Sequence, residues 1–102
     1  MKNPPDAIFS SNDTAAVSAI MQAKKQGVKI PEELAVIGFN DDPIASIVEP
    51  ALSSISHPAM KMGELSTKRI LEHADKKIEQ GVSEITVLDT EVIVRASSLR
   101  KK

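Results

Sequence analysis

Two short apolar segments, each ending abruptly in small polar and acidic residues, constrain the fold of this chain most. The first is Ala7–Ser11, followed by Asn-Asp-Thr at 12–14, and the second is Ala35–Phe39, followed by Asn-Asp-Asp at 40–42. Apolar runs of this length are typical of buried parallel strands. In open α/β sheets, ligands bind beyond the carboxyl ends of such strands, beside helix N-termini. The pattern therefore predicts part of a ligand-binding cleft.

The residues between and after these segments predict alternating strands and helices. A helix is expected from a cap at Asn12 or Asp13 to the basic turn before Gly27. The further expected elements, in chain order, are a short helix over Asp42–Val48, a half-exposed strand over Leu52–Ser56, a long helix over 59–79 that includes Ile78 and stops at Gly81, and strands over Glu84–Leu88 and Glu91–Val94. This order predicts an α/β fold with a mostly parallel sheet. Two substantial helices are few for a free-standing doubly wound sheet, so we expect a piece of a larger fold.

The composition excludes several classes of function. A formal net charge of −1 gives no global attraction for nucleic acid or an anionic membrane, and the basic end at residues 100–102 is too small for a nucleic-acid site. With no cysteine, the chain has no disulfide and no thiolate metal site, which is compatible with the cytoplasmic location that we expect. No apolar run approaches the ~20 residues needed to span a bilayer. The only aromatic residues are two phenylalanines, Phe9 and Phe39, and both are predicted to pack in the core.

Five segments of the chain resemble one family in the same order and with the same spacing. They cover residues 5–13, 27–39, 50–55, 62–65 and 92–98. The family is that of the LacI/GalR-type bacterial transcriptional regulators, and the resemblance is to the C-terminal part of their effector-binding region. That region is similar to periplasmic sugar-binding proteins. The resemblance covers nearly the whole chain.

The resemblance implies a partial, three-layer periplasmic-binding-protein-like fold, a fragment of a two-lobed domain. Residues 1–102 would be its C-terminal segment, with about 1–55 and 89–99 in the C-terminal lobe and about 56–88 crossing to the N-terminal lobe. The family reads DNA with an N-terminal helix-turn-helix, so DNA would be contacted only through domains absent from this chain. The apolar face of the long helix would then be exposed, which predicts a homodimer or a swapped oligomer.

The resemblance also assigns effector-binding residues at the two strand ends. Asn12 matches a position whose side chain hydrogen-bonds a sugar effector in the family, and an amide offers a hydroxyl both donors and an acceptor. Asn40 falls where many members carry an effector-binding Asp. Because Asn40 lacks that charge, one interpretation is that Asp41 or Asp42 binds the effector instead. The alternative is that Asn12 and Asp13 only cap a helix, Asp13 being the favoured cap, and that Asn40 and Asp41 only organise the turn before Pro43.

A second set of residues corresponds, by resemblance, to the surface through which C-terminal lobes pair in dimers. The alternative interpretation is ordinary core packing for some of them. The predicted dimer residues are Val17, Ile20, Met21, Ile47 and Val48.

The sequence favours a binding segment over an enzyme. Asp13, Asp41 and Asp42 suggest a Mg²⁺ pocket of the receiver type, but the other receiver residues are not at the required positions. No Gly-x-Ser-x-Gly elbow is present, and we predict no catalytic residue, no metal and no cofactor. The predicted function is effector binding, of a sugar or a related metabolite, and dimerisation within a LacI-type regulator. The alternatives are a segment of a periplasmic sugar-binding protein for transport, and a small receiver-like domain.

Overall fold

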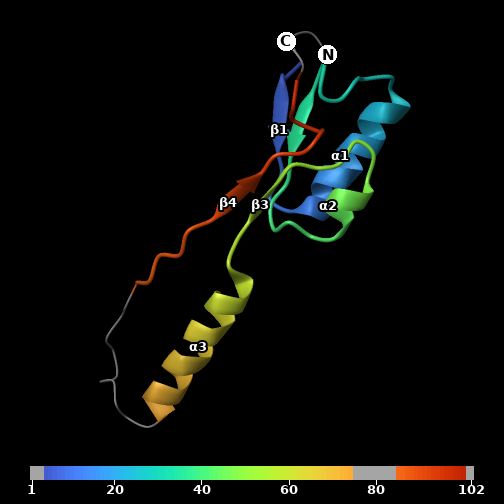
Figure 1. Ribbon diagram of the computed structural model, residues 1–102. Coiled ribbons are helices and arrows are strands. Elements are labelled where there is room, and N and C mark those ends of the chain that lie inside the picture. The colour runs from blue at the N-terminus through green and yellow to red at the C-terminus, as the bar shows by residue number, and fades with distance from the viewer. Residues whose placement is uncertain (1–3, 75–84, 101–102) are drawn as a thin grey trace. The chain divides into compact units, whose positions relative to one another are not determined.

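The computed structural model describes residues 4–74 and 85–100, which form two compact units. One unit holds the described residues of Met1–Ser56 and Glu91–Lys102, and the other holds those of His57–Thr90. The elements, in chain order, are β1 (Ala7–Phe9), α1 (Asp13–Lys25), β2 (Ala35–Ile37), α2 (Ile44–Ile47), β3 (Ser54–Ser56), α3 (Ala59–Ala74) and β4 (Glu91–Ile93) (Figure 1). The predicted α/β class is confirmed.

The first unit is built on β1 and β2, which lie side by side and parallel (Figure 1). Phe9 is in register with Ile37, so both strands end at the same level. On its other side β2 reaches the segment before β3 through a parallel bridge between Ile37 and Ser53. β3 pairs antiparallel with β4, with Ile55 opposite Val92. The parallel first half that the sequence predicted is therefore present.

Helix α1 supplies one side of the core of this unit. Its apolar residues at helical spacing pack with β2, α2 and the segment before β3, and the buried cluster is Ala16, Val17, Ile20, Val36, Ala45 and Leu52. Full burial of an Ile side chain such as Ile20 stabilises a fold by about 1.5–3 kcal/mol. The helix ends after two lysines, and Gly27 follows with a φ of +77°, as the predicted glycine stop requires.

The C-terminal segment joins the same core through a buried serine. The Ser97 hydroxyl donates to the Val36 carbonyl oxygen at 2.6 Å and accepts from the Ser53 N–H at 2.8 Å. The Ser97 carbonyl oxygen in turn accepts from the Val36 N–H at 3.0 Å. Ser97 thus forms hydrogen bonds with β2 on one side and with Ser53, the residue before β3, on the other.

Phe9 is not a core residue, contrary to the prediction. Its side chain is 64% exposed, whereas its neighbour Ile8 is half-buried. Successive side chains of a strand point to opposite faces, so Ile8 and Phe9 cannot both face α1. Among the described residues, no other element covers the face of β1 that carries Phe9, so this side chain stays exposed.

The second unit consists, in its described part, of residues 57–74, which include α3, and residues 85–90. No side chain of α3 is buried, and its exposed apolar residues include Met60, Met62, Ile70 and Leu71. The predicted strand over Glu84–Leu88 is wrong for residues 85–88, which have no regular structure. The predictions at Ile78, Gly81 and Glu84, and those for residues 101–102, lie outside the described residues. None of the helices in the described ranges is long and apolar enough to cross a membrane.

Candidate functional site at the carboxyl ends of β1 and β2

The two predicted strand ends meet at one edge of the first unit. Asn12 lies three residues beyond the end of β1, and Asn40 lies three residues beyond the end of β2. Pairing continues past β1, since the Ser10 N–H donates to the Ile37 carbonyl oxygen at 2.8 Å. After β2 the chain turns toward β3, and the Asn40 N–H donates to the Ile55 carbonyl oxygen at 2.9 Å. Polar side chains from two separate segments are thus placed at a single sheet edge, as the sequence predicted.

Asn12 is the N-cap of α1. Its Oδ1 accepts a hydrogen bond from the Ala15 N–H at 2.8 Å, and its side chain is exposed. Because Oδ1 is already engaged, Nδ2 is the atom through which Asn12 can donate to a hydroxyl at this edge. The expectation that Asp13 is the cap is wrong, and the structural reason is that Asp13 is turned inward.

Asp13 is a fully buried carboxylate at the first position of α1. The Ser54 hydroxyl donates to its Oδ1 at 2.7 Å, and the Asp42 N–H donates to its Oδ2 at 2.6 Å. A Cβ on Gly38 would collide with Oδ1, so the carboxylate fills the space that this glycine leaves. Both oxygens thus have donors, as a buried charge requires. The sequence reasoning did not anticipate this role.

The residues 40–42, which we call the 40–42 loop, turn sharply after β2. Asn40 has a φ of +106° and Asp41 a φ of +52°, in a region that Asn and Asp enter more readily than most residues. The exposed Asn40 side chain donates through Nδ2 to Asp42 Oδ1 at 2.5 Å. Asn40 and Asp42 thus lie together at the tip of the loop, and Asn40 both organises the turn and faces solvent.

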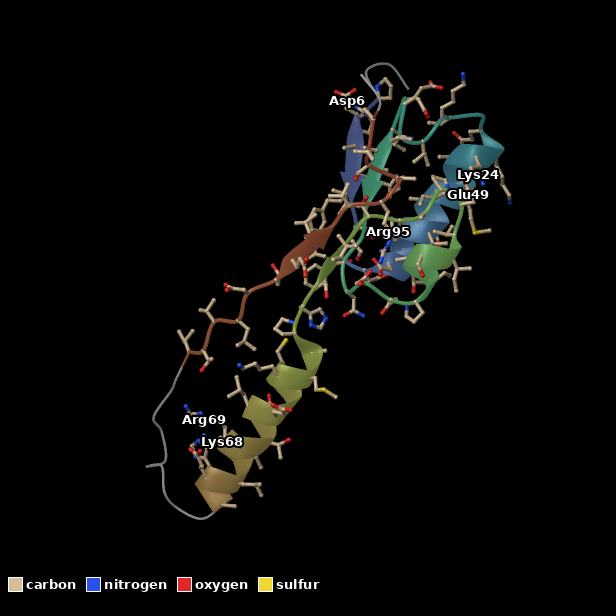
Figure 2. The ribbon with its side chains drawn as sticks, in the orientation of Figure 1. Asp6, Lys24, Glu49, Lys68, Arg69 and Arg95 are labelled. Carbon is tan, nitrogen blue, oxygen red and sulfur yellow. The ribbon has the colours of Figure 1, made fainter. Side chains whose placement is uncertain are left out.

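The Asp41 side chain is held by Arg95, a residue of the 92–98 segment for which no local sequence pattern indicates this role. Arg95 Nη2 lies 2.8 Å from Asp41 Oδ1, and Nη1 donates to the Leu52 carbonyl oxygen at 2.8 Å. The Asp41 N–H donates to Ser54 Oγ at 3.0 Å. Figure 2 shows the Arg95 side chain extending into the first unit. In this structure Asp41 therefore anchors the loop, whereas the side chains of Asn12 and Asn40 are exposed at the edge.

The predicted dimer residues divide between core and surface. Ile20 is fully buried and Val17 is 8% exposed, so both pack in the core. Val48 is half-buried and packs against that core. Met21 on α1 and Ile47 on α2 are 57% and 77% exposed, and only these two of the five are open to a partner.

No metal centre accompanies the site in the part of the chain that the structure describes. Within residues 4–74 and 85–100, no group of three or more His, Cys, Asp or Glu side chains is arranged to hold an ion. The Asp13 carboxylate already accepts hydrogen bonds from the Ser54 hydroxyl and the Asp42 N–H. The Asp41 carboxylate is paired with Arg95. Hydrogen bonding to a polar ligand is the chemistry that the exposed amides of this edge can perform.

The chain is similar to proteins with known roles. The family described as the periplasmic binding protein-like domain matches residues 1–98. The NTD biosynthesis operon regulator NtdR of Bacillus subtilis is 37% identical over 98 residues, which are 96% of this chain and 30% of that protein. The lactose operon repressor of Rhizobium radiobacter is 34% identical over 94 residues, which are 92% of this chain and 80% of that sequence. The chain thus spans about 30% of the length of the regulator NtdR.

Solved structures give the same picture. The transcriptional regulator CelR in complex with cellobiose aligns with a TM-score of 0.84 and 28% identity, over 91% of this chain and 28% of that one. A LacI family transcriptional regulator from Lactobacillus casei with bound sucrose aligns with a TM-score of 0.76 and 28% identity, over 92% of this chain and 34% of that one.

Proposed function

This chain belongs to the periplasmic-binding-protein-like domain family of LacI-type transcriptional regulators, and we propose that it is an effector-binding and dimerisation segment of such a regulator. The observation that carries the proposal is that Asn12 and Asn40 each lie three residues beyond the in-register ends of two parallel strands. Two similar structures contain cellobiose and sucrose, so the proposed effector is a sugar or a related hydroxyl-rich molecule.

In this proposal the chemistry at the edge is binding without catalysis. Asn12 donates through Nδ2 to an effector hydroxyl while its Oδ1 continues to cap α1. Asn40 offers its amide from the tip of the 40–42 loop, and Asp41, held by Arg95, fixes that loop. Effector binding favours one conformation of the regulator over another, and the shift in population changes its affinity for DNA. DNA is contacted by parts of the regulator other than these 102 residues.

The proposed division into lobes follows the two compact units. Residues of about 1–55 and 89–99 would belong to the C-terminal lobe, and about 56–88 would cross to the N-terminal lobe. In support, the chain separates into units between Ser56 and His57 and again between Thr90 and Glu91.

We place the dimer contact of this lobe on Met21 of α1 and Ile47 of α2. Both are large apolar side chains that the unit leaves exposed, and α1 and α2 are in contact within that unit. Ile44, 42% exposed, extends the same surface along α2. Apolar side chains of this size gain by being buried against a partner.

Calorimetric titration with cellobiose and with sucrose tests the effector proposal. The variant Asn40→Gly removes the amide but permits the positive φ at this position, so the loop backbone is preserved. We expect a sugar to bind the parent chain and its dissociation constant to rise about tenfold in the variant, the loss expected for one or two hydrogen bonds. As a control, Gln22→Ala removes an exposed amide from α1 and should leave the affinity unchanged. Equal affinity of the parent and Asn40→Gly would contradict the assignment.

A further inference from the structure

The 40–42 loop requires support from outside itself. Two consecutive non-glycine residues, Asn40 and Asp41, have positive φ angles of 106° and 52°. Such conformations are costly, and they persist only where the surroundings define them. The hydrogen bond from Asn40 to Asp42 lies within the loop and cannot position it relative to the sheet. The contacts that position the loop therefore come from other elements.

The first external tether is the carboxylate of Asp13. This side chain is fully buried at the first position of α1, and it accepts the N–H of Asp42 at 2.6 Å and the hydroxyl of Ser54 at 2.7 Å. The N-terminal end of a helix favours a negative charge, so α1 stabilises this carboxylate where it stands. Gly38 provides the room that it occupies. One side chain thus links α1, the loop and β3.

The second external tether is Arg95, which follows β4. Its guanidinium lies 2.8 Å from the Asp41 carboxylate and donates to the Leu52 carbonyl oxygen at 2.8 Å. The backbone N–H of Arg95 donates to Ser53 Oγ at 2.8 Å. The planar fork of arginine can engage two acceptors at fixed geometry, which a lysine cannot. The loop is therefore held from a second side by the segment that leaves β4.

Ser54 connects the two tethers. Its hydroxyl donates to Asp13 Oδ1 and accepts from the N–H of Asp41, whose carboxylate meets Arg95. A continuous set of contacts thus runs from the start of α1 through β3 and the loop to the residue that follows β4. These contacts fix the loop relative to both α1 and the segment that follows β4.

We infer that Asp13 and Arg95 are positioning residues that hold the 40–42 loop in the conformation that presents Asn40, and that they link this loop to α1 and to the segment after β4. The inference rests on the proposed function in one respect, namely that Asn40 contacts the effector.

Amide hydrogen exchange without any ligand tests the positioning role. In Asp13→Asn the charge is lost and an amide nitrogen replaces one acceptor oxygen, so the Asp42 N–H either loses its acceptor or donates to a neutral and weaker one. We expect the Asp42 amide to exchange about tenfold faster or more, while the amide of Val36 in the core changes by less than about twofold. The control Asp6→Asn makes the same substitution at an exposed site and should change neither.

A second variant tests the other tether and covers the case in which Asp13→Asn fails to fold. Arg95→Lys keeps the charge but loses the fork, and we expect faster exchange at the Asp41 amide with the Val36 amide unaffected. An equal rise in the exchange rate of the Val36 amide in either variant would show a merely structural role. Unchanged exchange at the Asp41 and Asp42 amides would show that Asp13 and Arg95 do not hold the loop. Either result overturns the inference.

The affinity for cellobiose separates this inference from the proposed function. If the parent chain binds no sugar but the exchange results are as expected, the positioning role stands and the effector assignment fails. If Asn40→Gly loses affinity while Asp13→Asn and Arg95→Lys bind cellobiose as the parent does, the effector assignment stands and the positioning role fails.

Discussion

Replacing Gly38 with alanine tests the central packing arrangement of the site. Gly38 is buried between the end of β2 and Asp13, and a Cβ there would collide with Asp13 Oδ1 and lie 3.1 Å from Leu52 Cδ2. The Asp13 carboxylate is short and its two oxygens are held by hydrogen bonds, so it cannot move aside without breaking them. The substitution Gly38→Ala therefore displaces the carboxylate.

The expected cost follows from those two hydrogen bonds. Each bond to a charged group contributes about 1.5–3 kcal/mol, so their loss lowers the free energy of unfolding by about 3 kcal/mol or more. A domain of this kind has a total stability of about 5–15 kcal/mol, so the variant is strongly destabilised. In an Asp13→Ala background the collision is gone, and the added cost of Gly38→Ala should fall to about 1 kcal/mol, caused by the close Leu52 contact.

The assay is urea unfolding of the parent, the two single variants and the double variant. Because the chain has no Trp or Tyr, fluorescence is of little use, and the methyl signal of the buried Ile20 in NMR spectra reports on the core. The double-mutant cycle should give a coupling free energy of about 2 kcal/mol between positions 13 and 38. An equal cost of Gly38→Ala in both backgrounds would refute the reasoning.

Two further predictions concern the cap and the dimer surface. In thermal unfolding, Asn12→Ala should lower the stability of the first unit by about 1 kcal/mol. Asn12→Ser keeps a capping oxygen and should cost only a few tenths of a kcal/mol. Equal losses in the two variants would mean that the capping oxygen of Asn12 is not energetically significant. Ile47→Asp should shift the chain from dimer to monomer in sedimentation velocity while its far-UV circular dichroism spectrum stays that of the parent. The matched change Val87→Asp at another exposed apolar position should leave the dimer intact. Dimers that survive Ile47→Asp would contradict the placement of the interface.

Local sequence signals were sufficient for the elements that place the site. The apolar runs before Asn12 and Asn40 predicted β1 and β2, and helical spacing with Gly27 predicted α1. These elements depend on neighbouring residues, which periodicity and capping report well. The family resemblance, which rested on five segments in order, is confirmed by the domain match over residues 1–98 and by the 34% identity to the lactose operon repressor of Rhizobium radiobacter.

The contacts that hold the site together could not be predicted in the same way. Asp13 and Ser54, or Asp41 and Arg95, are far apart in the sequence, and no local pattern links them. The serines at 53, 54 and 56 indicated that this strand carries polar side chains, but not which groups they contact. Phe9 was misplaced because an apolar strand predicts burial only where a neighbouring element covers both faces.

The most direct test of the account is to map where a sugar contacts the chain. In NMR spectra of the ¹⁵N-labelled protein, addition of cellobiose should shift the backbone and side-chain amide signals of Asn12 and Asn40 most, with smaller shifts at Asp41 and Asp42. The exposed Met21 and Ile47 should remain unshifted, because they lie on the proposed dimer surface. Shifts centred on Met21 and Ile47, or no shift at Asn12 and Asn40 with either cellobiose or sucrose, would contradict the claim that these strand ends form an effector site.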